Sequence, residues 1–208
     1  MRITKKADDR RNEILDVAER LFMSIGYAQT TVNAIIQEIG VAKGTFYYHF
    51  SSKEDVMHAV VMRIVERIVQ GARRIVDDNQ LTAPEKLMQI IMGQISQPSE
   101  QGDMMDELHH VDNAELHQKS LVESIIHLTP VFTEVIEQGI EEGYFSTQYP
   151  KETIEFLLVS AQFLFDDGIF TWSEEELQTK ALAFTSIMER VLQAEEGSFA
   201  YLINKLSR

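Results

Sequence analysis

The chain has 208 residues, of which 44 % are hydrophobic and 25 % are charged, the composition of an ordinary globular protein. It contains no Cys, which excludes disulfide bonds and thiolate zinc sites, and no apolar run is long enough for a membrane span. The segment Met1 to Arg11 is polar and basic, unlike a secretory signal, so we expect a cytoplasmic protein.

The first predicted helix covers about residues 9–25. Gly26 is placed to end it, because glycine readily adopts the left-handed conformation that follows many helices. The apolar residues recur at intervals of three and one, the spacing of an amphipathic helix. They are Ile14, Val17, Ala18, Leu21, Phe22 and Ile25.

Two short helices joined by a turn come next. The first spans Val32 to Ile39, with Thr31 as its expected N-cap and Gly40 at its end. The second spans Lys43 to His49. Two short helices separated by a three- or four-residue turn containing Gly have the sequence form of a helix-turn-helix.

The second of these helices is rich in hydrogen-bond donors and aromatic rings. Only Phe46 and Phe50 are expected to face a core. The other positions surround Gly44, which lets the backbone approach a ligand closely. Such a surface suits contact with the phosphates and base edges of DNA.

The run from Thr31 to Glu54 reads T-V-x-x-I-x-x-x-I-G-V-x-K-G-T-F-Y-Y-H-F-x-S-K-E. This string resembles the DNA-binding domain of the tetracycline-repressor (TetR) family. The match covers roughly the first quarter of the chain, because it extends upstream through Ile14, Ala18, Leu21, Phe22, Gly26 and Tyr27. The resemblance implies a bacterial DNA-binding regulator that is not an enzyme.

The candidate DNA contacts lie in and beside the second short helix. Lys43 can reach a base edge or a phosphate, Thr45 and Tyr47 are assigned to DNA by the resemblance, and Thr31 and Lys53 stand at helix starts that suit phosphate. The complete set is Thr31, Lys43, Gly44, Thr45, Tyr47, Tyr48, His49 and Lys53. Alternatives remain open: Gly44 could serve helix packing, and Tyr47 could cap the small core.

The net charge of −14 is unevenly distributed. Residues 1–53 hold eight Lys and Arg and six Asp and Glu, a net charge of +2, whereas residues 54–208 carry −16. A basic footprint that neutralises phosphate is available in the first part: Arg2, Lys5, Lys6, Arg10, Arg11, Lys43 and Lys53.

The rest of the chain is also predicted to be helical. A long helix over residues 53–76 starts at a capping box, formed by Ser51 with Glu54 or by Ser52 with Asp55. Further helices are expected at 83–98, 100–111, 113–142, 150–165 and 174–195, with a helical tail near 199–206. Pro130 should kink or break the helix over 113–142 near Leu128. No strand alternation is present, so the fold class is all-α.

Two domains are therefore expected. Residues 1–52 would form a three-helix DNA-binding domain, and residues 53–208 a larger ligand-binding and dimerisation domain. The helix over 150–165 is apolar on all sides, so we expect it to be buried on more than one face. The resemblance implies that the last two helices form a four-helix dimer interface. Its candidates are Phe184, Ile187, Met188 and Val191.

A largely apolar ligand pocket is expected among the middle helices, close to Pro130. The candidate lining residues are Ile91, Met104, Leu108, Leu121, Ile125, Phe132 and Phe163. The acidic balance of residues 54–208 favours a neutral or cationic lipophilic compound. The alternative is a filled core with no cavity.

The stretch from Met104 to His117 raises the question of a metal. Asp106 with His110, and His109 with Asp112, could each share a helix face. A solvated helix surface explains the same residues, and no metal site or cofactor is predicted.

Three classes of function remain. The leading hypothesis is a ligand-responsive repressor that binds a palindromic operator as a homodimer. The alternatives are a constitutive DNA-binding regulator and an enzyme with an accessory DNA-binding domain, although no catalytic constellation stands out.

Overall fold

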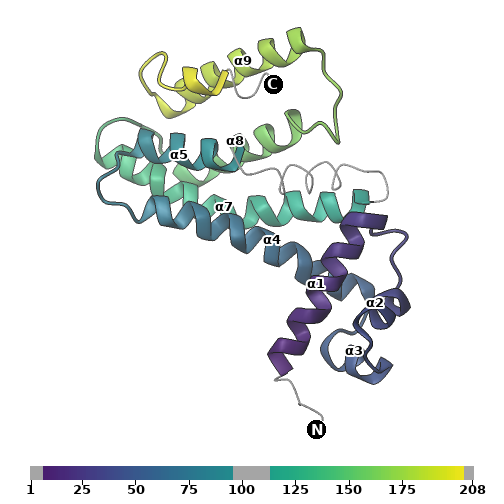
Figure 1. The fold of residues 1–208 in the computed structure, drawn as a ribbon. Coiled ribbons are helices and arrows are strands. Elements are labelled where there is room, and N and C mark those ends of the chain that lie inside the picture. Colours follow the sequence, from purple (N-terminus) through teal and green to yellow (C-terminus); the bar gives the residue numbers. More distant parts are fainter. Residues whose placement is uncertain (1–6, 96–112, 204–208) are drawn as a thin grey trace. The chain divides into compact units, whose positions relative to one another are not determined.

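The computed structural model describes residues 7–95 and 113–203, and within these ranges every regular element is helical, as predicted. The elements are α1 (Ala7–Ile25), α2 (Val32–Ile39), α3 (Lys43–His49), α4 (Lys53–Val76), α5 (Ala83–Ile95), α7 (Ala114–Glu141), α8 (Pro150–Leu164), α9 (Glu174–Leu192) and the 3₁₀ turn η2 (Ala200–Leu202) (Figure 1). The expected helix over residues 100–111 lies outside the described residues.

The chain forms two compact units. The N-terminal unit comprises Met1–Val65 and Ser99–Ser120, and the C-terminal unit comprises Glu66–Pro98 and Leu121–Arg208. Both α4 and α7 contribute residues to each unit. The domain boundary predicted between residues 52 and 53 coincides with the start of α4 and stays a prediction.

Local capping fixes the short helices of the N-terminal unit. The Thr31 hydroxyl accepts from the Ala34 N–H at 3.1 Å, which confirms Thr31 as the N-cap of α2. Gly40 ends α2 with φ of 71°, a conformation that glycine adopts without steric cost. At the start of α4, Ser52 accepts from the Asp55 N–H at 3.1 Å, so the Ser52 alternative for the cap is the one formed.

The N-terminal unit has a small core of its own. Its helices α1 to α4 each contribute fully buried apolar side chains: Ile14, Ala18 and Phe22 from α1, Ile35 from α2, Phe46 from α3, and Val56, Val60 and Val61 from α4. On its surface, Arg63 of α4 forms ion pairs with Asp16 and Glu19 of α1. These contacts join α1 to the first half of α4.

One apolar cluster forms the core of the C-terminal unit. It combines side chains from every described helix of that unit, including Ala72 (α4), Leu87 and Ile90 (α5), Val131, Phe132 and Val135 (α7), Ile154 and Leu157 (α8), and Phe184, Met188 and Leu192 (α9). Phe145 and Phe199, from the connecting segments, and Leu202, from η2, close it. Burial of this cluster supplies the main stabilisation of the unit.

A buried lysine fastens the end of α4 inside this unit. Lys86 is 3 % exposed, and its ammonium donates to the Val76 carbonyl at 2.6 Å and to Gln138 Oε1 at 2.7 Å. The Gln138 amide in turn donates to the Leu81 carbonyl. A cation at the last carbonyl of α4 also opposes the negative end of the helix dipole.

Pro130 does not break α7; of the two expected outcomes near Leu128, a kink or a break, the break does not occur. The helix is continuous from Ala114 to Glu141, with Pro130 exposed on its surface. Its neighbours Leu128, Val131 and Phe132 are buried and hold the helix against the core. The carbonyl deprived of a donor is that of Ile126, a residue 57 % exposed, where water can replace the missing bond.

The expectation that α8 is buried on more than one face is also wrong for the single chain. Ile154 and Leu157 are buried, but Phe156 is 76 % exposed, and Val159 and Leu164 are exposed as well. The core covers one face of α8 only. The sequence pattern cannot distinguish a helix buried all round from one with an uncovered apolar face.

Two helical glycines provide a test of this packing. A Cβ at Gly139 of α7 would overlap the Phe145 ring, whereas a Cβ at Gly71 of α4 would meet only the Arg74 side chain, at 4.0 Å. Gly139→Ala should therefore destabilise the protein by about 1–3 kcal/mol through overpacking. Gly71→Ala should stabilise it by about 0.5–1 kcal/mol. Equal denaturation midpoints for both variants would contradict this packing.

Candidate nucleic-acid interface

The orientation of α3 follows from two buried aromatic residues. Phe46 is 0 % exposed and Phe50, which follows the helix, is 2 % exposed, with their ring centroids 6.1 Å apart. Both were expected to face the core, and both do. Because this helix has only seven residues, burial of Phe46 determines which of its faces is turned outward.

The outward face of α3 brings several predicted contact residues together. Lys43, Gly44, Tyr47 and Tyr48 are exposed, Tyr48 most of all at 78 %. The Lys43 ammonium lies 5.7 Å from the centroid of the Tyr47 ring. Ammonium and phenol groups on one short surface can donate hydrogen bonds to phosphates and base edges.

Thr45 and His49 are less accessible than the rest of this face. Both are half-buried. The His49 ring makes an edge-on contact with the Tyr48 ring, with centroids 4.9 Å apart. His49 can therefore orient Tyr48 as well as offer a contact of its own.

Gly44 has no packing role within the described part of the chain. It is exposed, and a Cβ built on it meets nothing within 4 Å. Glycine inside a helix costs about 0.5–1 kcal/mol relative to alanine. Helix packing within the described residues therefore does not explain Gly44. The other explanation is that Gly44 lets a binding partner approach the helix backbone closely.

Thr31 and Lys53 both have intramolecular roles at helix starts. The Thr31 hydroxyl caps α2. The half-buried Lys53 ammonium donates to the Tyr27 carbonyl at 2.9 Å and lies 4.1 Å from the centroid of the Tyr27 ring. Lys53 thus ties the start of α4 to the turn that follows α1, whatever it contributes to a phosphate.

The other basic side chains near α3 are partly engaged. Arg10 pairs with Glu13 of the same helix, and Arg11 lies over the Phe50 ring at 5.0 Å from its centroid. Arg2, Lys5 and Lys6 lie outside the described residues. Within the described part of the footprint, Arg11 and Lys43 are exposed cations that can meet phosphate.

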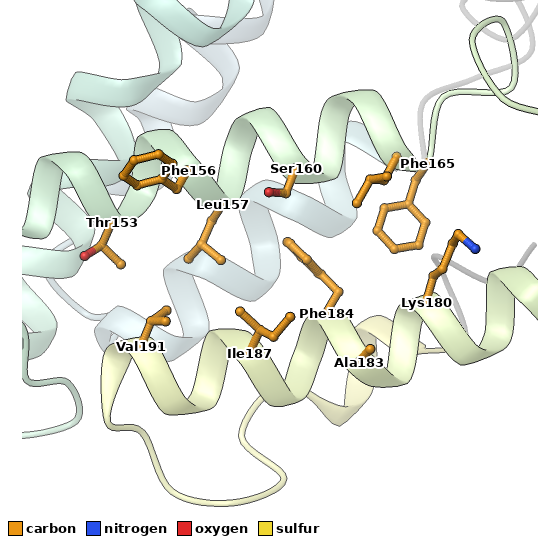
Figure 2. Close-up of a pocket in the computed structure, with 11 residues that line it drawn as sticks. Thr153, Phe156, Leu157, Ser160, Phe165, Lys180, Ala183, Phe184, Ile187 and Val191 are labelled. Atoms are coloured by element: carbon orange, nitrogen blue, oxygen red, sulfur yellow. The ribbon is translucent and has the colours of Figure 1, made fainter.

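An open apolar groove of about 320 Å³ lies between α8 and α9 (Figure 2). Figure 2 shows side chains of the two helices facing each other across it. The lining residues are Thr153, Phe156, Leu157, Ser160, Leu164, Phe165, Lys180, Ala183, Phe184, Ile187 and Val191. Three of the four predicted dimer residues are among them, since Ile187 and Val191 are exposed here and Phe184 forms part of the floor.

Met188 differs from the other three predicted dimer residues. It is 4 % exposed and belongs to the core of its own unit. The groove is also lined by residues that were not predicted from the sequence, namely Phe156, Leu157, Ser160 and Lys180. The sequence did mark Phe156, because it is a large apolar residue on α8 between Ile154 and Leu157, which are both apolar.

The predicted ligand-lining residues are only partly described. Met104 and Leu108 lie outside the described residues. Ile91, Leu121, Ile125 and Phe163 are half-buried, and Phe132 is in the core. That these side chains surround one pocket stays a prediction.

The metal hypothesis gains no support from the described part of the chain. Residues 7–95 and 113–203 contain no group of three His, Asp or Glu side chains placed to hold a metal ion. Asp106, His109, His110 and Asp112 lie outside these ranges, and His117 is buried. Among the same described residues, no helix is long and apolar enough to cross a membrane.

Two family models match the chain. Residues 14–60 match the model described as bacterial regulatory proteins of the tetR family, and residues 95–187 match a tetracyclin repressor-like C-terminal domain. The HTH-type transcriptional repressor KstR2 of Mycobacterium tuberculosis is 28 % identical over 155 residues, which are 69 % of this chain and 73 % of that protein. An HTH-type transcriptional regulator of Staphylococcus aureus is 32 % identical over 74 residues, which are 36 % of this chain and 40 % of that protein.

Solved structures with low sequence identity share the fold. A TetR-family transcriptional regulator from Pectobacterium atrosepticum has a TM-score of 0.66 at 19 % identity, over 92 % of this chain and 98 % of that one. SmeT, the repressor of the Stenotrophomonas maltophilia multidrug efflux pump SmeDEF, has a TM-score of 0.61 at 21 % identity, over 90 % and 92 %. SmeT has also been solved as a complex with triclosan, a structure with a TM-score of 0.61 at 20 % identity, over 91 % and 94 %.

The two family matches together extend over more than half of the chain, and they agree with a helix-turn-helix whose second helix presents a polar, aromatic surface. The chain belongs to the TetR family and is a DNA-binding transcriptional regulator.

Proposed function

We propose that this regulator is a ligand-responsive repressor. A homodimer binds a palindromic operator, and a small lipophilic molecule releases it. The observation that carries the DNA-binding half of the proposal is the outward face of α3, where Lys43, Tyr47 and Tyr48 surround a glycine that no internal packing requires. Relatives that are themselves named repressors support repression over activation.

On DNA, α3 would lie in the major groove. Lys43 and the tyrosine hydroxyls would donate to phosphates and base edges, and Gly44 would let the helix backbone approach the duplex. Thr31, Thr45, His49 and Lys53 complete the proposed contact set. The acidic remainder of the chain would be kept away from the phosphates by charge repulsion.

The groove between α8 and α9 supports a dimer of this chain. Phe156, Ile187 and Val191 expose large apolar side chains there, and such a surface is stabilised when a partner covers it. A second copy would cover it with the same two helices in a two-fold arrangement. Two-fold symmetry also matches a palindromic operator, since one helix-turn-helix contacts few base pairs.

The ligand would bind in the C-terminal domain, here taken as residues 53–208. A ligand changes DNA affinity only if it prefers one of two conformations that differ in half-site spacing. The long helix α4, which contributes residues to both units, is the natural lever. The net charge of −16 over residues 54–208 favours a neutral or cationic lipophilic compound, and the triclosan complex of SmeT shows that a lipophilic molecule binds that protein.

Two alternatives have distinct tests. A constitutive regulator would stay on its operator in the presence of a broad lipophilic library, whereas a ligand-responsive one would be released by some member. An enzyme with an accessory DNA-binding domain would turn over substrates in a direct activity screen. For each reading we place the protein in the bacterial cytoplasm, where its DNA target is.

The first of three predictions from this proposal concerns the α3 surface. Lys43→Ala and Tyr48→Ala should each weaken binding to a duplex selected from a random pool by the wild-type protein. Each lost contact should cost about 1–3 kcal/mol per half-site, and a dimer loses it twice. Lys151→Ala and Tyr149→Ala are matched controls, because both side chains are exposed on the C-terminal unit. Mobility shifts unchanged in both α3 variants would reject α3 as the recognition helix.

The second prediction separates stability from binding at Gly44. Gly44→Ala should leave thermal stability equal or higher, because the added methyl group meets no atom within 4 Å and alanine favours the helix. DNA affinity should nevertheless fall, since the methyl group would stand between the helix and the duplex. Gly71→Ala, on α4, is the control with the same chemical change. Full DNA affinity in Gly44→Ala would mean that the duplex does not approach this backbone.

The third prediction concerns assembly. Ile187→Asp should convert the dimer to a monomer and abolish operator binding while the fold is retained, because Ile187 is 52 % exposed in the groove. Leu182→Asp is the matched control, since Leu182 is 49 % exposed on α9 but does not line the groove. Sedimentation equilibrium distinguishes the two. A dimer that survives Ile187→Asp would place the interface elsewhere.

A further inference from the structure

The side chain of Asn113, the residue before α7, is fully buried against the end of α1. Asn113 is 0 % exposed. Its Oδ1 accepts from the Tyr27 N–H at 2.6 Å, and its Nδ2 donates to the Phe22 carbonyl at 3.2 Å. One amide therefore bridges the last turn of α1 and the residue after Gly26. All of these residues belong to the N-terminal unit.

The segment that Asn113 holds determines where the helix-turn-helix begins. After α1 the chain turns at Gly26, with φ of 85°, and the Thr30 hydroxyl donates back to the Gly26 carbonyl at 2.8 Å. Thr31, the N-cap of α2, follows directly. A displacement of this turn would move the start of α2, and α3 follows α2 after a short connection.

Tyr27 is held from two sides. Asn113 binds its N–H, and Lys53, the first residue of α4, binds its carbonyl and lies over its ring. The Tyr27 ring also packs edge-on against Phe22, with centroids 5.2 Å apart. Burial, with smaller contributions from Glu115 and Glu54, raises the pKa of the Tyr27 phenol to about 12. The Tyr27 phenol therefore stays neutral at physiological pH.

The contacts to Tyr27 come from the starts of α4 and α7. These are the two helices that contribute residues to both units. The division falls after Val65 in α4 and after Ser120 in α7. Beyond Ser120, α7 carries three of the proposed ligand-lining residues, namely Leu121, Ile125 and Phe132. A change in the axial position of α7 would therefore reach Asn113 through the helix itself, because hydrogen-bonded helices transmit displacement along their axes.

We propose that Asn113 is a positioning residue that couples the state of the C-terminal unit to the helix-turn-helix. The hydrogen bonds to Phe22 and Tyr27 form together at one position of the start of α7 and break together when α7 shifts by about 1 Å, since a side-chain contact at about 3.6 Å is no longer a hydrogen bond. Both backbone partners are buried, so the bonded and broken arrangements differ sharply in free energy. This inference rests on the proposed function and names the contact through which a ligand would act.

A purely structural role is the competing explanation, in which Asn113 only fastens the start of α7 to the end of α1. Asn113→Ser separates the two through the DNA-dependent exchange, because serine remains polar but is too short to bridge Phe22 and Tyr27. Asn113→Asp is the second variant, since it keeps an oxygen for the Tyr27 N–H and loses the donor to Phe22. Thr129→Val is the matched control: Thr129 is 2 % exposed on the same helix, and its hydroxyl donates only to the Ile125 carbonyl within α7.

The experiment measures hydrogen exchange of the full-length protein with and without the selected DNA duplex. In the wild type, DNA binding should change exchange over residues 121–141, because coupling between sites is reciprocal. Asn113→Ser should lose this DNA-dependent change and alter DNA affinity by about 5–150-fold, the usual range of coupling between sites. Thr129→Val should retain both properties of the wild type.

The outcomes distinguish this inference from the proposed function. A wild type that binds no duplex from the pool overturns the proposed function and the coupling with it. A wild type that binds DNA without any change over residues 121–141 overturns the coupling alone, even if both Asn113 variants fail to fold. An Asn113→Ser variant that behaves like Thr129→Val leaves Asn113 with a structural role only and also overturns the coupling.

Discussion

The burial of Phe46 is the constraint on which the DNA-binding surface depends. A helix of seven residues is too short to be stable alone in water, so α3 exists because one of its side chains enters the core of the N-terminal unit. That burial fixes the rotation of the helix about its axis. Lys43, Gly44 and Tyr48 then face outward as a direct consequence.

In the C-terminal unit, by contrast, the core is too small to cover all the apolar side chains of its helices. The cluster around Leu87, Phe132 and Leu192 buries one face of α8 and one face of α9. The remaining apolar side chains, with Phe156 the most exposed, line an open groove. Exposed apolar area of this kind stabilises association, which is why a second copy of the chain is the proposed occupant.

Polar contacts place the long helices with more precision than the apolar core can. Lys86 fixes the last carbonyl of α4, Lys53 fixes its first turn, and Asn113 fixes the start of α7 to Tyr27. Each donor or acceptor is directional, whereas apolar packing tolerates small displacements. In our proposal, the Asn113 contact converts a small movement of α7 into a repositioned turn after α1.

The sequence by itself determined the features that depend on neighbouring residues. The bounds of α2, α3 and α4, the Thr31 cap, the left-handed Gly40 and the core positions Phe46 and Phe50 all follow from spacing and capping within a few residues. Only the tertiary structure decided which apolar residues of α8 and α9 are covered, that Met188 faces its own core, and that Asn113 contacts Tyr27, 86 residues away. Periodicity shows which apolar side chains share a helix face. It does not show what lies against that face, because the partner comes from a distant segment whose position depends on the packing of the whole unit.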